Sequence, residues 1–408
     1  MIDFDFNEYC CGCTSCASSC PTNAIKMVAN AEGFLMPEIT KDACIKCGKC
    51  EKSCPYINSL NEGATVSRQD FDDKKAYLYY SQNDGRKDSA SGGFVYDVYR
   101  YFLDNGGYAS GCVWDKEIVA QHITSNQLQD VRRMQSSKYV QSDISGCYAE
   151  IKDLLKKGES VVFCGTPCQT AGLHYYLGKK SIDNLLTICC ICHGVPSPGV
   201  WSAYKNSLEI KYGGALVDVN MRDKSYKGYS TSYVRYTFDI DDEAARTPQT
   251  ARYVGMPTFL ADPYIFLFTD DLFLRNSCYH CQYKGGNNRA DIIVGDYYAS
   301  TSGAGNLGCS TVITMNDKGD DFIKKLDGVC KIGEKDVVIG ANSMLWKSVP
   351  KTDKREQFFK QFVSGDTDVF SKFLPMRFHV KRIMNNIGLF GAYMSLKRKI
   401  NAFLNRKR

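Results

Sequence analysis

The chain lacks any long hydrophobic run. None of its 408 residues belongs to a stretch approaching the roughly 18 unbroken apolar residues of a membrane-spanning helix. The acidic N-terminus, Met1 to Phe6, leads directly into a cysteine-rich loop. It leaves no room for a signal peptide, which needs a basic start and an apolar stretch. These absences argue against a membrane-spanning or exported protein and predict a cytoplasmic location.

The chain has no net positive charge outside the C-terminus. The nine Lys and Arg residues from Arg377 to Arg408 have no Asp or Glu among them, and the whole chain has a net charge of +6. The residues before Arg377 therefore carry a net charge of −3. A nucleic-acid-binding domain needs a basic stripe on its folded surface, so we expect no nucleic-acid partner.

Cysteine, by contrast, is abundant, with 20 residues. The segments Cys10 to Pro21 and Cys44 to Pro55 both have the spacing C-x2-C-x2-C-x3-C-P. This is the spacing of bacterial ferredoxins, in which three thiolates of one loop bind one [4Fe-4S] cluster and the fourth binds the other. The predicted ligands are Cys10, Cys13, Cys16 and Cys54 for one cluster, and Cys44, Cys47, Cys50 and Cys20 for the second.

Two other interpretations of these cysteines are weaker. Zinc sites usually pair two C-x2-C units across a longer spacer. Cysteines two or three positions apart rarely reach the geometry of a disulfide, and nothing in the sequence indicates an oxidising compartment. Cys11 has no place in the repeat and is expected to be a free thiol beside the loop.

The length of the chain allows two or three domains. We expect an α+β, ferredoxin-like domain with two clusters at residues 1–58 and a polar linker at 59–75. Short apolar runs then alternate with helical patterns, which predicts a larger α/β domain at 76–375. Residues 376–408 form the basic tail.

The tail has apolar residues at helical steps between groups of Lys and Arg: Ile383, Ile387, Phe390, Met394, Leu396, Ile400 and Phe403. It is predicted to be an amphipathic basic helix. The helix either packs against its own domain or a partner, or makes peripheral contact with an anionic membrane surface.

Two segments of the α/β domain have the form of anion-binding turns. Ser91-Gly92-Gly93 precedes a helical pattern, so its serine would cap the helix and its glycines would let a ligand approach the free amides. The alternative is an ordinary capped helix start. Gly165-Thr166-Pro167 follows a predicted strand, with the threonine suited to the cap and the proline to the first helical position. Phosphate groups favour that geometry.

Four further cysteines stand at predicted turns: Cys168, Cys192, Cys278 and Cys281. Together they would suffice for a third [4Fe-4S] cluster. The alternatives are that they bind zinc, or that they are free thiols in core or cleft positions.

Several ordered motifs carry a resemblance to a known family: Ser91-Gly92-Gly93, Met134 to Ser142, Phe163 to Gln169, Ile191 to Ser197, and Cys278 to Asp296. Together with the two repeats, they resemble the coenzyme F420 hydrogenase/dehydrogenase beta subunit family. With its two full repeats in front of the α/β domain, the chain resembles a bacterial branch of this family that is associated with polysaccharide biosynthesis. In that branch the deazaflavin coenzyme F420 is not an expected substrate.

The resemblance implies an FAD-binding α/β domain that exchanges electrons with the clusters. It implies flavin contacts at Ser91, Gly92, Gly93, Lys138, Tyr139, Gln141, Ser142, Gly165, Thr166 and Pro167. It also favours Cys192, Cys278 and Cys281 as cluster ligands. A flavin accepts either a hydride or single electrons, and clusters pass single electrons, so the two cofactors suit each other.

His193 and Asp296 are the candidate catalytic residues, because each could move protons at the edge of the flavin. A structural histidine and a strand-end aspartate that caps backbone amides are the alternatives. Lys138 would stabilise negative charge on reduced flavin or bind a phosphate group, and the alternative is a solvated lysine in a polar loop.

The sequence thus predicts an iron–sulfur flavoprotein oxidoreductase that passes electrons between [4Fe-4S] clusters and FAD to reduce or oxidise a small substrate or coenzyme. Its partner would be a redox protein or a small-molecule electron donor or acceptor. The alternative is a non-catalytic, polyferredoxin-like subunit that docks a partner enzyme. A third class, a zinc-stabilised interaction protein, would contain zinc instead of clusters.

Overall fold

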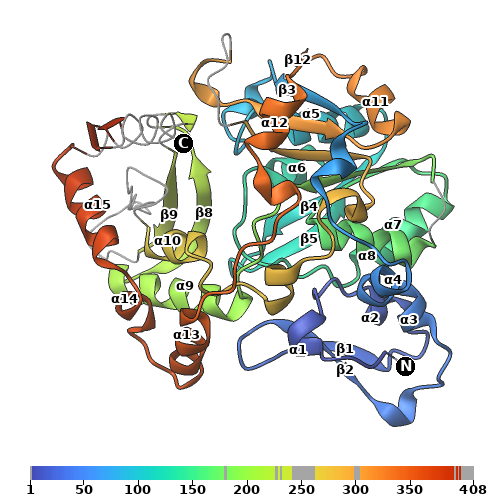
Figure 1. Cartoon of the computed structure of the whole chain (residues 1–408), viewed down its shortest axis with the longest axis horizontal. Helices are drawn as coiled ribbons and strands as arrows, with labels where there is room; N and C mark the ends of the chain where they lie inside the picture. Colours follow the sequence, from blue (N-terminus) through green and yellow to red (C-terminus); the bar gives the residue numbers. More distant parts are fainter. Residues whose placement is uncertain are drawn as a thin grey trace.

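The computed structural model describes residues 2–178, 182–225, 228–229, 232–240, 262–297, 304–389, 392–393 and 395–396. These residues form three regions (Figure 1). An N-terminal segment, blue in the figure, lies below a large sheet with its helices. A second group of helices with a two-stranded sheet lies to the left of both.

The N-terminal segment contains a hairpin and short helices. Its elements are α1 (Phe6–Tyr9), α2 (Ser15–Ser19), β1 (Ile25–Ala29), β2 (Leu35–Ile39), the 3-10 helix η1 (Lys41–Ala43), α3 (Lys49–Ser53) and α4 (Pro55–Asn61). Strands β1 and β2 pair antiparallel, with Ile25 opposite Ile39. At the turn between them Gly33 has a φ of +79°, a conformation that favours glycine.

The large sheet has eight strands in the order β12-β3-β11-β10-β7-β6-β4-β5. They are β3 (Lys75–Tyr80), β4 (Tyr108–Trp114), β5 (Ala120–Ser125), β6 (Val161–Gly165), β7 (Leu185–Cys190), β10 (Ile292–Asp296), β11 (Ser310–Thr314) and β12 (Val329–Ile332). Strands β4, β6, β7 and β10 run parallel, whereas the remaining neighbours are antiparallel. The parallel strands all end at one edge of the sheet, which we call the carboxyl edge and where α/β proteins commonly bind ligands.

Helices cover the sheet: α5 (Phe94–Asp104), α6 (Leu128–Met134), α7 (Cys147–Lys156), α8 (Pro167–Leu177), α11 (Asp317–Ile323) and α12 (Lys335–Gly340). The predicted strand, turn and helix around Gly165-Thr166-Pro167 is confirmed, because α8 begins at Pro167 with Thr166 as its N-cap. The predicted Ser91 cap is wrong. Gly93 is the N-cap of α5, and the Ser91 hydroxyl donates to the Cys309 carbonyl at 2.7 Å instead.

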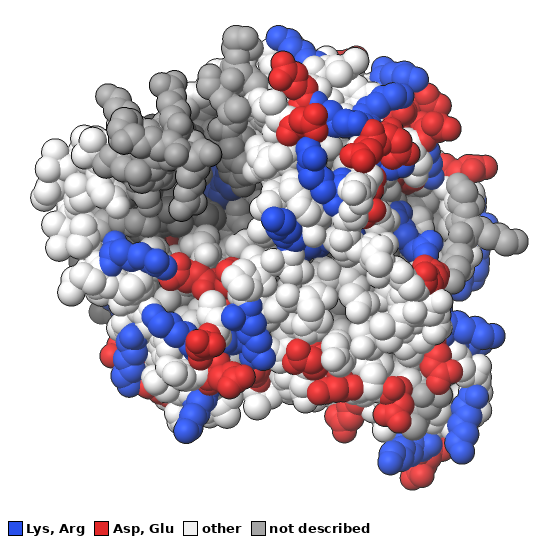
Figure 2. All heavy atoms as spheres, viewed as in Figure 1, with Lys and Arg blue, Asp and Glu red and all other residues white. Residues whose placement is uncertain are grey.

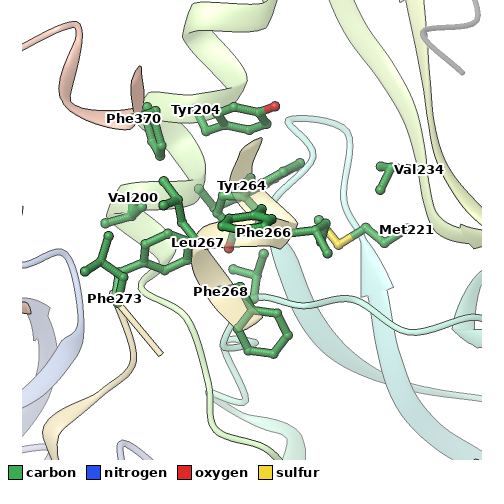
Figure 3. Packing of buried hydrophobic residues seen from close by; sticks show 14 of the residues in the cluster. Val200, Tyr204, Met221, Val234, Tyr264, Phe266, Leu267, Phe268, Phe273 and Phe370 are labelled. Carbon is green, nitrogen blue, oxygen red and sulfur yellow. The ribbon is translucent and has the colours of Figure 1, made fainter. Parts of the chain in front are cut away.

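A second hydrophobic core lies beside the sheet. It is built from α9 (Pro198–Tyr212), β8 (Ala215–Asp223), β9 (Tyr233–Asp239), α10 (Pro263–Thr269), α13 (Lys354–Val363), α14 (Val369–Lys372) and α15 (Met376–Asn386). Aromatic rings fill its centre, where Tyr264 stacks on Tyr204 with ring centroids 5.4 Å apart (Figure 3). Phe34 of the N-terminal hairpin joins this core beside Phe359. The core therefore also holds the N-terminal segment in place.

The predicted linker, residues 59–75, packs along the large domain. The Glu62 carboxylate pairs with Arg289, and the Asp70 carboxylate accepts a hydrogen bond from the Gly286 amide at 2.9 Å. Phe71, in the 3-10 helix η2 (Arg68–Phe71), is fully buried. The connection is thus an ordered part of the structure.

Helix α15 leads into the tail. Its Phe378 is buried against Phe266, whereas Val380 and Ile383 are exposed. Four predicted apolar positions of the tail, Phe390, Met394, Ile400 and Phe403, lie outside the described residues.

The surface has no single dominant charge on the face that Figure 2 shows. Where its residues are described, Lys and Arg are intermixed with Asp and Glu. Within the described ranges, no helix has the length and apolar character needed to cross a membrane.

Candidate functional site

The two cysteine repeats fold into loops of the same shape. The residue before each short helix is left-handed: Thr14 has a φ of 61° before α2, and Gly48 a φ of 70° before α3. Each helix is followed by an extended cysteine, Cys20 or Cys54. Helices α2 and α3 pack on each other, so each last cysteine can reach the cysteines of the other loop.

The structure brings together Cys10, Cys13, Cys16 and Cys54, which we call the inner set. Burial raises the pKa of the Cys54 thiol to about 11, and the nearby Cys10 and Cys50 thiols add to the effect. The amide of Gly12 donates to the Cys10 sulfur at 3.3 Å. Such buried thiols ionise readily only beside a positive centre, such as the iron of a cluster.

Cys20, Cys44, Cys47 and Cys50 line one pocket and form the outer set. The amide of Ala24 donates to the Cys20 sulfur at 3.2 Å. Cys47 is exposed, and the neighbouring Ile45 retains 63% of its surface. The outer set therefore lies at the molecular surface.

Cys168, Cys192, Cys278 and Cys281 line another pocket, together with His193, and form the edge set. Cys168 follows β6, Cys192 follows β7, and Cys278 lies in the 3-10 helix η6 (Asn276–His280), which Cys281 follows. The amide of Val195 donates to the Cys278 sulfur at 3.4 Å. Burial raises the pKa of the Cys281 thiol to about 12. Cysteines from three segments that are distant in sequence thus converge at the carboxyl edge.

None of the 20 cysteines, all of which lie in the described part of the chain, forms a disulfide. Among the described residues, no three His, Cys, Asp or Glu side chains gather closely enough to hold one metal ion. In a cubane cluster each thiolate binds a different iron atom, so its ligands stand farther apart than those of a single ion.

Cys11 lies between the inner and edge sets. Its thiol interacts with Cys13 of the inner set and Cys168 of the edge set. Helix α8, which carries Cys168, also presses Gly172 against the inner loop, where an added Cβ would lie 3.0 Å from the Cys13 sulfur. The three sets therefore follow one another, in the order outer, inner and edge, from the surface to the carboxyl edge.

The three segments expected to contact a flavin are linked at this edge. Arg222 donates to the Tyr139 hydroxyl at 3.1 Å and to the Ala90 carbonyl, next to Ser91, at 3.4 Å. The Gln169 amide group donates to the Ser142 hydroxyl at 2.9 Å, which joins that segment to the start of α8.

Several of the expected flavin contacts have structural roles. A Cβ at Gly92 would lie 2.3 Å from the Tyr79 carbonyl oxygen, so packing alone requires glycine there. The Lys138 ammonium donates to the carbonyls of Gln135 and Arg133 at 2.7 and 2.8 Å at the end of α6, and desolvation lowers its pKa to about 8. Gln141 donates to the Cys11 carbonyl at 2.9 Å and thus faces the inner loop.

Both candidate catalytic residues have side-chain partners. The His193 Nε2 atom lies 2.5 Å from the Asp271 carboxylate, and Asp296, the last residue of β10, pairs with Arg222 at 2.9 Å. Strands β7 and β10 are parallel neighbours, so His193 and Asp296 lie along the same edge. Asp296 forms an ion pair there, whereas the sequence offered a backbone cap as its alternative role.

Three cationic side chains at this edge were not predicted from the sequence: Arg86, Arg222 and Lys224. Lys224 is buried and donates to the carbonyls of Arg86, Ser91 and Leu307 at 2.7–2.8 Å. Desolvation, reinforced by Arg86 and Arg222, lowers the Lys224 pKa to about 7. No local pattern marks these residues, because only the folded chain brings them together.

Two known proteins resemble short parts of the chain in sequence. An uncharacterised polyferredoxin-like protein of Methanocaldococcus jannaschii is 32% identical over 71 residues, which are 15% of this chain and 42% of that protein. The ferredoxin-type protein NapF of Haemophilus influenzae is 40% identical over 48 residues, 12% of this chain and 27% of that protein. This chain thus spans less than half the length of both relatives.

A solved structure, the F420-reducing [NiFe] hydrogenase complex of Methanosarcina barkeri in a xenon derivative, aligns over 73% of this chain and 90% of the matched chain. The sequence identity is 15% and the TM-score is 0.39.

Two family matches cover complementary parts of the chain. Residues 9–58 match the 4Fe-4S dicluster domain. Residues 158–337 match the C terminus of the coenzyme F420 hydrogenase/dehydrogenase beta subunit. The chain therefore contains a 4Fe-4S dicluster region and is related, over residues 158–337, to the C terminus of coenzyme F420 hydrogenase/dehydrogenase beta subunits.

Proposed function

We propose that the chain is a flavin-dependent iron–sulfur oxidoreductase that works in the cytoplasm. Electrons pass, in either direction, along the outer, inner and edge sets to FAD at the carboxyl edge, where a small substrate or coenzyme reacts. The observation that carries the proposal is the arrangement of the three cysteine sets. They follow one another from the exposed Cys47 to the strand ends of the α/β domain.

The chemistry of the donors fits [4Fe-4S] clusters. Every set consists of four thiols, and in each set a backbone amide donates to a cysteine sulfur: Gly12 to Cys10, Ala24 to Cys20, and Val195 to Cys278. Hydrogen bonds to sulfur and burial tune the reduction potentials of clusters. We therefore assign a third cluster to the edge set.

The carboxyl edge fits an anionic cofactor such as FAD. Helix α5 has 11 residues and no side chain that caps its N-terminus, so its first amides are available to a phosphate group. Arg86 lies beside this turn, and its buried Nε atom has no hydrogen-bond partner among the described residues. These groups would hold the diphosphate, and bound FAD would supply the conversion between single electrons and a hydride.

The protein's own side chains would handle protons. If Asp271 accepts a hydrogen bond from Nε2 of His193, the Nδ1 atom of His193 is left to accept and return a proton. The ion pair with Arg222 orients Asp296 at the end of β10. His193 and Asp296 thus act as the proton-handling pair at the edge.

Cofactor analysis of anaerobically purified protein tests the proposal. We expect about twelve iron atoms per chain, four for each of three clusters, and one FAD. Cys281→Ser removes an edge ligand and should lower the iron content by about four atoms. Cys330→Ser, at an exposed cysteine outside the three sets, is the matched control and should change nothing. Iron without flavin, even after reconstitution with FAD, would favour the non-catalytic electron-transfer subunit.

The proposed branch of the family excludes one substrate, the deazaflavin. Two full repeats resemble the bacterial proteins associated with polysaccharide biosynthesis, so we propose that reduced deazaflavin does not reduce the bound FAD. Stopped-flow absorbance of the flavin after mixing with reduced deazaflavin measures this step. Rapid bleaching of the flavin band would contradict the proposed branch and leave the oxidoreductase assignment intact.

Peripheral membrane contact through the tail is part of the proposal, because α15 exposes Val380 and Ile383. The double variant Ile383→Gln/Ile387→Gln removes exposed apolar groups and spares Phe378, which belongs to the core. We expect weaker co-sedimentation with anionic liposomes. Equal binding of the variant and the parent would exclude this role of the tail.

A further inference from the structure

Arg275 is a fully buried cation at the boundary between the N-terminal segment and the large domain, with 1% of its surface exposed. Its guanidinium donates to the Cys10 carbonyl at 2.9 Å, the Leu35 carbonyl at 2.7 Å and the Gln141 side-chain oxygen at 2.8 Å. All three acceptors are neutral. Among the described residues, no carboxylate lies within ion-pair distance of Arg275.

The guanidinium lies directly on the inner loop. Gly12, between Cys10 and Cys13, has a φ of +67°, and a Cβ added there would lie 2.6 Å from an Nη atom of Arg275. Arg275 also lines the pocket of the edge set. The positive charge is therefore held next to the inner set and screened from water by both domains.

A nearby cation changes the energetics of electron uptake. When an oxidised cluster accepts one electron, no bond forms or breaks and the site becomes one unit more negative. A buried positive charge stabilises that reduced form, because the Coulomb attraction is poorly screened in the protein interior. Net charge and hydrogen bonding are recognised determinants of cluster potential.

We propose that Arg275 is a positioning residue that raises the reduction potential of the inner cluster above the value its thiolates alone would give. The proposal rests on the proposed function, since it requires a cluster in the inner set. Gln141 contributes by accepting the Nε hydrogen bond of Arg275 and donating to the Cys11 carbonyl, which fixes the guanidinium over the loop.

The chain supplies a matched control. Arg355 is also buried, with 2% of its surface exposed, and also joins the N-terminal hairpin to the large domain, through Glu32 at 2.5 and 3.0 Å. Its charge is compensated by that carboxylate, and its third contact is the Leu274 carbonyl at 3.0 Å. Loss of Arg355 thus removes a buried arginine from the same boundary without removing an uncompensated charge beside the inner loop.

The test is a redox titration of the clusters by electron paramagnetic resonance, with dithionite as the reductant. In Arg275→Gln we expect the inner midpoint potential to fall by about 59 mV or more, a tenfold change in the ratio of reduced to oxidised cluster. Arg275→Lys, which keeps the charge, should show a smaller fall, and Arg355→Gln should show none. Cys47→Ala and Cys281→Ala, which each remove a ligand of another set, assign the remaining midpoint to the inner set.

If Arg275→Gln does not fold, Gln141→Glu decides the question, because a carboxylate beside Arg275 neutralises its charge and should lower the same midpoint. An unchanged inner midpoint in the variant that folds overturns the proposal, as does an equal fall in Arg355→Gln. Absence of iron from the parent protein is a different result, because it contradicts the proposed function itself.

Discussion

The two cysteine repeats have the same spacing and the same loop shape but opposite surroundings. Position by position, Gly12 corresponds to Lys46, and both are left-handed, with φ values of +67° and +53°. Lys46 extends into solvent, whereas the space beside Gly12 is filled by Arg275. Cys11, buried between two cysteine sets, corresponds to the exposed Ile45. The cysteine spacing therefore determines the loop, and the surrounding domain determines whether the loop is buried or exposed.

Replacing Gly12 of the inner loop with lysine, the residue at the corresponding position of the outer loop, should have the largest effect. In Gly12→Lys the left-handed backbone is retained, but the new side chain collides with Arg275 and brings a second positive charge beside it. We expect a destabilisation of about 3 kcal/mol or more and loss of the inner cluster. Chemical denaturation and iron analysis measure the two effects. Full iron content in the folded variant would show that the inner loop tolerates a side chain.

The two loops should also differ in their resistance to oxidation, because only the outer loop has an exposed cysteine. Cys47 of the outer set is exposed, whereas Cys13, Cys16 and Cys54 of the inner set are buried. We expect iron release in air to be biphasic, with the outer cluster lost several-fold faster, because oxidants reach exposed sites first. The time course of iron bound by a chelator measures this. A single phase would contradict the assignment of inner and outer loops.

A smaller effect is expected for the corresponding positions Ser15 and Lys49. Ser15 is buried, and its hydroxyl donates to the Ser53 carbonyl at 2.8 Å between α2 and α3. Ser15→Ala should lower the free energy of unfolding by about 1–2 kcal/mol, because the carbonyl loses a buried partner. Lys49→Ala, at an exposed position, is the matched control and should be neutral in the same denaturant titration.

The reverse exchange, Lys46→Gly, should have the smallest effect. Glycine relieves the left-handed strain of a non-glycine residue, about 1 kcal/mol, but it also adds conformational freedom to the unfolded chain by a similar amount. We expect the free energy of unfolding and the iron content to stay unchanged. A marked loss of the outer cluster in this variant would show that the Lys46 side chain, rather than solvent, supports the outer loop.

Local features of the structure could be predicted from the sequence. The two repeats specify their loops because the cysteines, the left-handed positions and the short helices lie within a few residues of one another. The turn at Thr166 and Pro167 was predicted for the same reason. Ser91 was misassigned as a helix cap because its actual partner, the carbonyl of Cys309, is distant in sequence.

Long-range features could not be predicted. The core around Tyr204 and Tyr264 was included in one large α/β domain, since apolar runs do not reveal which of two cores they enter. Polar residues 59–75 suggested a linker, because partners such as Arg289 lie far along the chain. Arg275 contacts the inner loop from a similar distance in sequence, so no motif identifies it.

The backbone of the N-terminal hairpin lies in direct contact with the backbone of the large domain. An added Cβ at Gly33 would lie 2.5 Å from the Cα of Gly199, near the start of α9. This contact, together with the ordered connection at residues 59–75, holds the segment at two separate points. Under the proposed function, electron delivery within the chain would therefore be a first-order process, whose rate should be independent of protein concentration and unaffected by free ferredoxin competing for the same position.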